Sequence, residues 1–174
     1  SDHVREKDGL WAVLLWLSIL AARREPVADI MAAHWREFGR DYYTRHDYEG
    51  VDKSAAEAMM ADMRERLSAL PGQTFAGMTI SAADDFSYTD PVDGSTAVSQ
   101  GIRLFFGDKA RVVFRLSGTG TVGATVRLYM ERFEVDPEQQ HLPTASALAE
   151  VNAAAMSALG LLERLGRSVP DVIT

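Results

Sequence analysis

A glycine-rich segment between two arginines is the part of the chain whose residues could do chemistry. Gly118-Thr-Gly-Thr-Val-Gly123 lies between Arg115 and Arg127. Glycines let a backbone approach a ligand closely and turn its N–H groups toward an anion. Two guanidinium groups can hold one phosphate by charge-assisted hydrogen bonds, each contributing roughly 1.5–3 kcal/mol. The hydroxyl donors of the segment are Ser117, Thr119 and Thr121. These residues predict a phosphate-binding loop, and the alternative is a tight glycine hairpin with two solvated arginines.

The same glycines match the G-x-G-x-x-G pattern of dinucleotide-binding proteins, but the residues after them do not. That pattern requires a helix directly after the glycines, so that the pyrophosphate meets a helix N-terminus. Here Val126, Leu128 and Met130 alternate with polar or aromatic residues, which is typical of a strand. A strand-loop-strand arrangement makes a nicotinamide or flavin site a poor interpretation.

The loop must be positioned by strands, and four segments have the composition and alternation of strands. They are Gly77–Ala83, Ile102–Phe106, Arg111–Leu116 and Ala124–Phe133. Gly107-Asp108 suits a hairpin turn, and Asp90–Gly94 suits a longer loop. The aromatic and charged stretch Tyr42–Tyr48 is interpreted as a half-buried extended linker, with a base- or sugar-stacking surface as the alternative.

Four further segments have helical spacing of apolar residues and recognisable ends. They are Gly9–Arg24 after the capping residue Asp8, Pro26 to Gly39, a helix that starts with the capping box Ser54-x-x-Glu57, and Thr144–Leu165. Strands flanked by helices predict an α+β fold: a four-stranded, mainly antiparallel sheet with helices packed on one face. Residues 1–40 would then be a separate helical element and linker.

Composition excludes several classes of protein. The chain has 174 residues, a net charge of -7 and no cysteine, which argues against a nucleic-acid partner and a disulfide scaffold. The apolar run Leu10–Ala22 is shorter than the roughly 20 residues that span a bilayer, so we expect a buried helix and no membrane association. The absence of cysteine fits a cytoplasmic protein. Because the chain starts without Met, we expect a piece of a longer polypeptide.

Several segments together resemble one known family, the phosphoglucomutases of the α-D-phosphohexomutase superfamily. Arg115-Leu-Ser-Gly-Thr-Gly120 and Gly123-Ala-Thr-Val-Arg-Leu-Tyr129 are similar to the family's C-terminal phosphate-binding loop. Other segments resemble the family in the same order: Asp2-His-Val-Arg-Glu-Lys-Asp-Gly-Leu-Trp11, His34-Trp35, Gly39-Arg-Asp-Tyr-Tyr43, Asp84-Asp-Phe86, Asp90-Pro-Val-Asp-Gly-Ser95 and Val172-Ile-Thr174. The resemblance covers essentially the whole chain.

The resemblance implies the C-terminal portion of a multidomain enzyme that interconverts glucose 1-phosphate and glucose 6-phosphate. In that family a phosphoserine donates its phosphoryl group with the help of Mg2+, and glucose 1,6-bisphosphate is the intermediate. Residues 1–40 would be the helical tail of the preceding domain plus a linker, and residues 41–174 the phosphate-binding domain. By position, Arg115, Ser117, Gly118, Thr119 and Arg127 would contact the non-transferred phosphate. Lys7 would contact the substrate and would be a candidate general acid or base.

Three parts of the family's machinery are missing from this sequence. It contains no Ser-His-Asn segment for a phosphoserine, no Asp-Gly-Asp metal loop and no sugar-reading Gly-Glu-x-Ser loop. We therefore expect no metal site in this chain, no activity of the chain by itself, and partners in the remaining mutase domains and a phosphosugar substrate. The alternative is a non-catalytic phosphosugar-binding or structural homologue.

Overall fold

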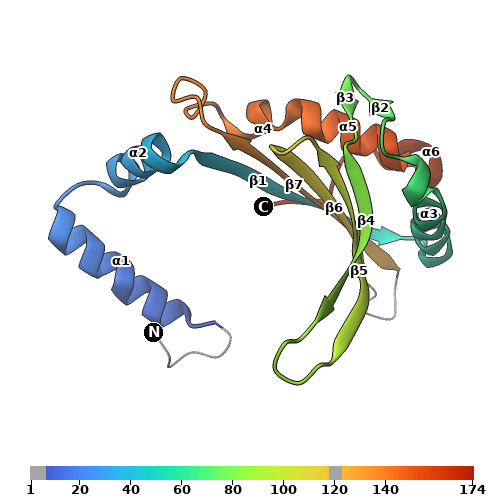
Figure 1. Cartoon of the computed structure of the whole chain (residues 1–174), viewed down its shortest axis with the longest axis horizontal. Coiled ribbons are helices and arrows are strands. Elements are labelled where there is room, and N and C mark those ends of the chain that lie inside the picture. The colour runs from blue at the N-terminus through green and yellow to red at the C-terminus, as the bar shows by residue number, and fades with distance from the viewer. Residues whose placement is uncertain (1–6, 118–122) are drawn as a thin grey trace. The chain divides into compact units, whose positions relative to one another are not determined.

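The computed structural model describes residues 7–117 and 123–174, which fall into two compact units. Unit 1 comprises Ser1–Arg40 and Val135–Gln140, and unit 2 comprises Asp41–Glu134 and His141–Thr174. Figure 1 labels most of their helices and strands.

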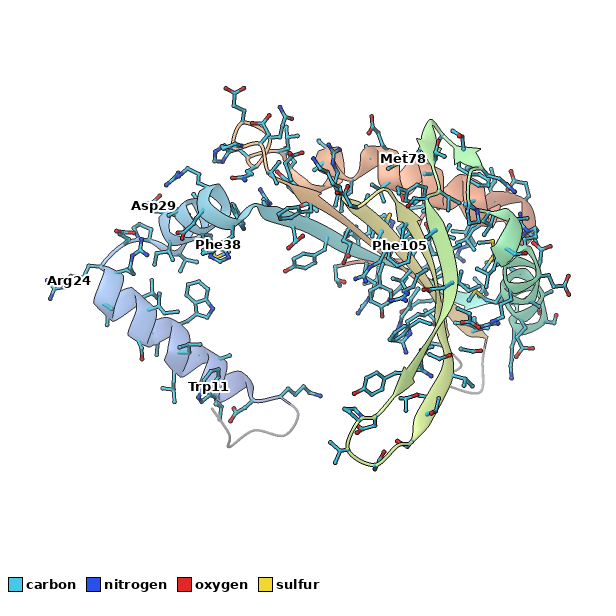
Figure 2. All side chains as sticks on the ribbon, viewed as in Figure 1. Trp11, Arg24, Asp29, Phe38, Met78 and Phe105 are labelled. Atoms are coloured by element: carbon cyan, nitrogen blue, oxygen red, sulfur yellow. The ribbon has the colours of Figure 1, made fainter. Side chains whose placement is uncertain are left out.

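Unit 1 contains two helices, as the sequence predicts. Helix α1 (Gly9–Arg23) begins at Asp8, whose carboxylate accepts a hydrogen bond of 2.9 Å from the backbone N–H of Trp11. It ends at Arg24, which adopts a left-handed backbone conformation with φ of 54°. No residue of α1 is buried. The large apolar residues from Leu10 to Leu17, Trp11 among them (Figure 2), are between 37% and 80% exposed, and Ile19 and Leu20 are half-buried. The expectation of a buried helix is therefore wrong for this chain.

The second helix of unit 1, α2 (Val27–Phe38), is tied to the segment Val135–Gln140. The side-chain amide of Gln140 donates a hydrogen bond of 2.9 Å to the backbone carbonyl of Trp35. The Arg40 guanidinium lies 4.1 Å above the centroid of the Trp35 ring and donates to the carbonyl of Gln140. These contacts fix the end of α2 against a segment distant in sequence.

Unit 2 is built on a six-stranded sheet in the order β4-β5-β6-β7-β1-β8. The strands are β1 (Arg40–Val51), β4 (Ala82–Thr89), β5 (Thr96–Phe106), β6 (Ala110–Ser117), β7 (Ala124–Glu134) and β8 (Val172–Ile173). Strands β4 to β7 form an antiparallel series, and β1 is antiparallel to β8. The mainly antiparallel α+β prediction is confirmed, but the predicted number of strands was four instead of six.

The two extra strands correct the interpretation of Tyr42–Tyr48 as a linker. The stretch is extended, but it lies inside β1, a strand of 12 residues between β7 and β8. Tyr42 and Tyr48 point into the core with 2% and 1% of their surface exposed. Alternate side chains of a strand point to opposite faces, so Tyr42 and Tyr48 enter the core while Tyr43, Arg45 and Asp47 lie on the other face.

The predicted strand Gly77–Ala83 is also corrected. Its first part belongs to a small hairpin of β2 (Thr74–Phe75) and β3 (Met78–Thr79), and only its end joins β4. The turn at Gly107-Asp108 between β5 and β6 is confirmed, as is the loop at Asp90–Gly94 between β4 and β5.

Helices cover one face of the sheet (Figure 1). Helix α3 (Lys53–Arg66) is followed by the short 3-10 helix η1 (Leu67–Ala69). The predicted single helix Thr144–Leu165 is three: α4 (Thr144–Ala147), α5 (Ala149–Leu159) and α6 (Leu161–Leu165), with a break at Gly160, whose φ is 62°. The core between helices and sheet includes Met59, Met60, Met63, Leu104, Phe114, Leu128, Val151 and Leu159.

Candidate anion-binding site

The β6–β7 hairpin places Arg115 and Arg127 directly opposite each other. The two residues are Cα partners in the antiparallel register, and Ser117 is the partner of Thr125. Directly opposed residues of an antiparallel pair share one face of the sheet. Because Phe114, Val126 and Leu128 are buried under the helices, the two arginines lie on the opposite, open face. The hairpin thus places both arginines on one face, Arg115 beside β5 and Arg127 beside β1.

Arg115 lies beside a strand position that has no side chain. The register of β5 and β6 places Gly101 next to it, and a Cβ atom built on Gly101 would lie 2.9 Å from the Arg115 Cγ atom. It would also lie 3.1 Å from the Phe114 carbonyl oxygen. Only glycine leaves room for Arg115 to lie across β5. A cavity of about 370 Å³ on the open face has Arg115, Gly101 and Arg103 in its wall.

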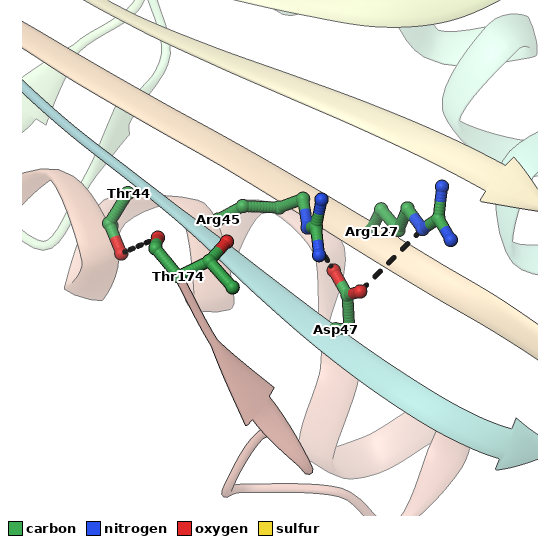
Figure 3. Close-up of polar contacts among 5 residues, drawn as sticks. All are labelled: Thr44, Arg45, Asp47, Arg127 and Thr174. Carbon is green, nitrogen blue, oxygen red and sulfur yellow. Dashed lines mark hydrogen bonds and ion pairs between the residues drawn. The ribbon is translucent and has the colours of Figure 1, made fainter. Parts of the chain in front are cut away.

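Arg127 lies beside a buried carboxylate. Asp47 on β1 has a side chain that is 5% exposed, with one oxygen 2.8 Å from the Arg45 Nε atom and the other 3.6 Å from the Arg127 Nε atom. Figure 3 shows Asp47 between these two arginines. Burying an isolated carboxylate is costly unless it is paired, so the two guanidiniums compensate for the burial of Asp47.

Strand β8 fixes the part of β1 that carries Arg45 and Asp47. The backbone N–H of Asp171 donates 2.8 Å to the Asp47 carbonyl, and the N–H of Arg45 donates 2.8 Å to the Thr174 carbonyl. The Thr44 hydroxyl donates 3.0 Å to the same Thr174 oxygen (Figure 3). These bonds determine the register of β1 on either side of Asp47.

On the helix-covered side, the neighbour of Asp47 is His46. Burial lowers the pKa of the His46 imidazole below its ordinary value, and the nearby Asp47 carboxylate opposes this only in part. The Nδ1 atom of His46 is buried and has no hydrogen-bond partner among the described residues. The neutral imidazole is therefore the favoured form in the folded chain.

The outgoing strand of the hairpin starts at a close backbone contact. Gly123 has a φ of 77°, and a Cβ built there would lie 2.9 Å from the Cα of Gly50 on β1. Both the left-handed conformation and the contact require glycine. This contact fixes the first residue before β7 against the end of β1.

The other predicted site residues are distributed as follows. Ser117 is half-buried at the end of β6, whereas Gly118 and Thr119 lie outside the described residues. Lys7 belongs to unit 1 and is exposed. Within residues 7–117 and 123–174, no group of three or more His, Asp or Glu side chains is placed to hold a metal ion. Nor does any helix in those ranges have the length and apolar character needed to cross a membrane.

Sequence reasoning missed the residues that support the two arginines. Asp47 and Arg45 belong to the stretch interpreted as a linker, and Gly101 is not among the predicted site residues. The alternation of Tyr42, Thr44, His46 and Tyr48 with Tyr43, Arg45 and Asp47 is a strand pattern, and it could have revealed that Arg45 and Asp47 share a face.

Known proteins give an independent comparison. Residues 40–171 match the family model "Phosphoglucomutase-1, C-terminal domain", and residues 1–38 match "Phosphoglucomutase/phosphomannomutase, alpha/beta/alpha domain III". The chain is 53% identical to a phosphoglucomutase of Rhizobium radiobacter over 174 residues and 47% identical to human phosphoglucomutase-1 over 180. Each alignment covers 100% of this chain and 32% of the relative, so the chain spans about a third of their length.

A solved structure agrees with these matches. The open form of Paramecium pp63/parafusin, a phosphoglucomutase, superposes with a TM-score of 0.86 at 43% identity, covering 100% of this chain and 30% of that one. The family-model match extends over most of the chain and includes both arginines of the hairpin. The chain therefore belongs to the phosphoglucomutase family and corresponds to its C-terminal part.

Proposed function

We propose that this chain is the phosphate-gripping part of a phosphoglucomutase that interconverts glucose 1-phosphate and glucose 6-phosphate. The reaction would proceed through a phosphoserine and glucose 1,6-bisphosphate. The observation that carries the proposal is the cross-strand pair of Arg115 and Arg127, which flanks a glycine-rich segment on the open face of the sheet. Two arginines on one face of a hairpin can supply guanidinium donors to one dianionic phosphate.

In this proposal the chain binds the phosphate that is not being transferred. Arg115 and Arg127 supply charge, Ser117 and Thr119 supply hydroxyl donors, and Gly118 lets the backbone approach the phosphate. Binding energy from the distant phosphate orients the reacting end of the sugar and favours closure of the cleft. Such energy is useful for catalysis because it positions the reacting groups before any bond changes.

Lys7 is proposed to contact the substrate near the reacting end. A lysine beside phosphate groups stays charged, so it would stabilise the charge that is transferred. In that position it would also be a candidate general acid or base. The structure describes Lys7 as an exposed residue of unit 1.

The rest of the enzyme is proposed to lie in further mutase domains. The exposed apolar side chains of α1 support this, because a helix that is apolar nearly all round needs partners. Those domains would supply the phosphoserine and hold Mg2+, and the isolated chain would be inactive. We also propose a domain boundary between residues 40 and 41, no nucleic-acid or membrane partner, and a cytoplasmic location.

The test is a titration of the purified chain with glucose 1-phosphate and glucose 6-phosphate, followed by backbone amide NMR. We expect saturable shifts around Ser117 and Ala124, and a loss of affinity of about tenfold or more in Arg115→Ala, because a charge-assisted hydrogen bond contributes roughly 1.5–3 kcal/mol. Arg111→Ala is the matched control, since Arg111 lies on the same strand and pairs with Glu131 at 2.8 Å. If the folded chain shows no shifts at millimolar ligand, or if both variants weaken binding equally, the proposal is wrong.

A further inference from the structure

We propose that Asp47 is the positioning residue for Arg127 in the phosphate grip. The inference rests on the proposed function, since it assigns a role within that site. It concerns a residue that lies 80 positions earlier in the chain than the arginine it would orient, on a different strand.

The first observation is which atom of Arg127 faces Asp47. The carboxylate oxygen lies 3.6 Å from Nε, the atom nearest the aliphatic stem of the guanidinium. Figure 3 shows the two terminal nitrogens of Arg127 directed away from Asp47. A guanidinium presents its donors as a planar fork, so a carboxylate at the Nε edge leaves the Nη edge for a second anion. Asp47 therefore sets the orientation without occupying the donors that would bind phosphate.

The second observation is that the two carboxylate oxygens of Asp47 face two different arginines. One oxygen is 2.8 Å from Arg45 and the other faces Arg127. One carboxylate thus lies between two guanidiniums, 2.8 Å from Arg45 and 3.6 Å from Arg127, and relieves the repulsion between them.

The third observation is that Asp47 is itself immobilised. Its side chain is 5% exposed, and its backbone carbonyl accepts a 2.8 Å hydrogen bond from Asp171. Its Cα partner on β8 is Val172. A rigid support is what a positioning residue requires, because a loosely held carboxylate would not fix the direction of Arg127.

The decisive variant is Asp47→Asn, which keeps the shape and removes the charge. General electrostatics predicts tighter phosphate binding, because the variant makes the chain less negative. Positioning predicts the opposite sign, because the neutral amide loses the charge attraction that acts on the Arg127 Nε at 3.6 Å. We expect the Kd for glucose 6-phosphate to rise about tenfold, which corresponds to about 1.4 kcal/mol. Asp47→Glu, which keeps the charge but moves it by one methylene, should lose less.

Glu131→Gln is the matched control, because it changes the net charge by the same amount on the same face. It should leave the Kd unchanged or slightly lower. If Asp47→Asn behaves like Glu131→Gln, the inference is overturned. The Tm of each variant is measured in parallel, and the titrations are run where all variants are folded.

A second measurement needs no ligand and separates this inference from the proposed function. The Nε–Hε signal of Arg127 in the 15N NMR spectrum should shift and broaden in Asp47→Asn and stay in place in Glu131→Gln. An unmoved signal overturns the positioning role even if phosphate binds. If the Arg127 signal shifts in Asp47→Asn but the parent chain binds no phosphosugar, the positioning of Arg127 by Asp47 is supported. The proposed function is then refuted.

Discussion

At the scale of single residues, the directions of the arginines on the open face depend on a glycine as well as on a carboxylate. Arg115 lies across β5 because Gly101 has no Cβ, which would otherwise meet the Arg115 Cγ at 2.9 Å. In our proposal Asp47 orients Arg127 through an ion pair, whereas Gly101 leaves space for Arg115. Arg115 thus has room to extend over β5, and Arg127 pairs with a carboxylate on β1.

Gly101→Ala should therefore displace Arg115. We expect a loss of stability of about 1–3 kcal/mol from overpacking and a several-fold weaker affinity for glucose 6-phosphate. Urea unfolding and the NMR titration measure the two effects. Val98→Ala, at an exposed position of the same strand, is the control and should change neither. In an Arg115→Ala background, Gly101→Ala should have no further effect on affinity; a persisting effect would show that the glycine acts on something else.

At the scale of elements, the sequence predicts best where one face of an element is uniformly apolar. The alternation in β6 and β7 reveals the hairpin and the shared face of its arginines, because every second residue enters the core. The alternation in β1 is harder to recognise, because it does not separate apolar from polar residues: Tyr43 is among the outward residues, and Thr44 and His46 are among the inward ones. β8 has two residues, too few for any period. The support of Arg127 by Asp47 depends on both of these strands, and so it could not be predicted.

Helix α3 shows a smaller correction at the same scale. The capping box predicts Ser54 as the N-cap, but the N-cap is Asp52, whose carboxylate accepts a 2.8 Å hydrogen bond from the N–H of Ala55. Bonds from the Ser54 hydroxyl and the Ala55 N–H lower the pKa of Asp52. Asp52→Ala should lower the Tm by a few degrees, because the first turn loses its acceptor. Ser54→Ala should lower it less; calorimetry that ranks the two variants the other way would restore the capping box.

At the scale of the whole molecule, an acidic chain carries a locally basic face. The net charge is -7, yet five arginines, Arg45, Arg103, Arg111, Arg115 and Arg127, lie on the open face of the sheet of unit 2. The carboxylates Asp47, Asp84 and Glu131 on the same face pair with all of these except Arg115 in the ion pairs described. Local potential, and not total charge, guides a small anion to its site. A negative net charge, which argues against a nucleic-acid partner, is therefore compatible with the proposed phosphosugar ligand.

The pH dependence of stability is also a property of the whole fold. The pKa of His46 is lowered by burial, so below its ordinary value of about 6.5 the unfolded chain takes up a proton that the folded chain does not. Stability should fall as the pH drops through about 6.5 and level off below the lowered folded pKa. Urea unfolding between about pH 7.5 and 5 should show a smaller fall in His46→Gln than in the parent chain. His141→Gln, at an exposed position, is the control; equal slopes in all three would contradict the assignment to His46.

The pairing of β1 with β8 has a consequence for how unit 2 is made. β1 is the first strand of the unit to be synthesised and β8 the last, so the strand that carries Asp47 has no partner on that side until residues 172–174 appear. An unpaired strand edge is a template for association with other chains. Contacts between such distant segments also form slowly. During synthesis, then, the period of greatest risk of aggregation should last until those three residues are added.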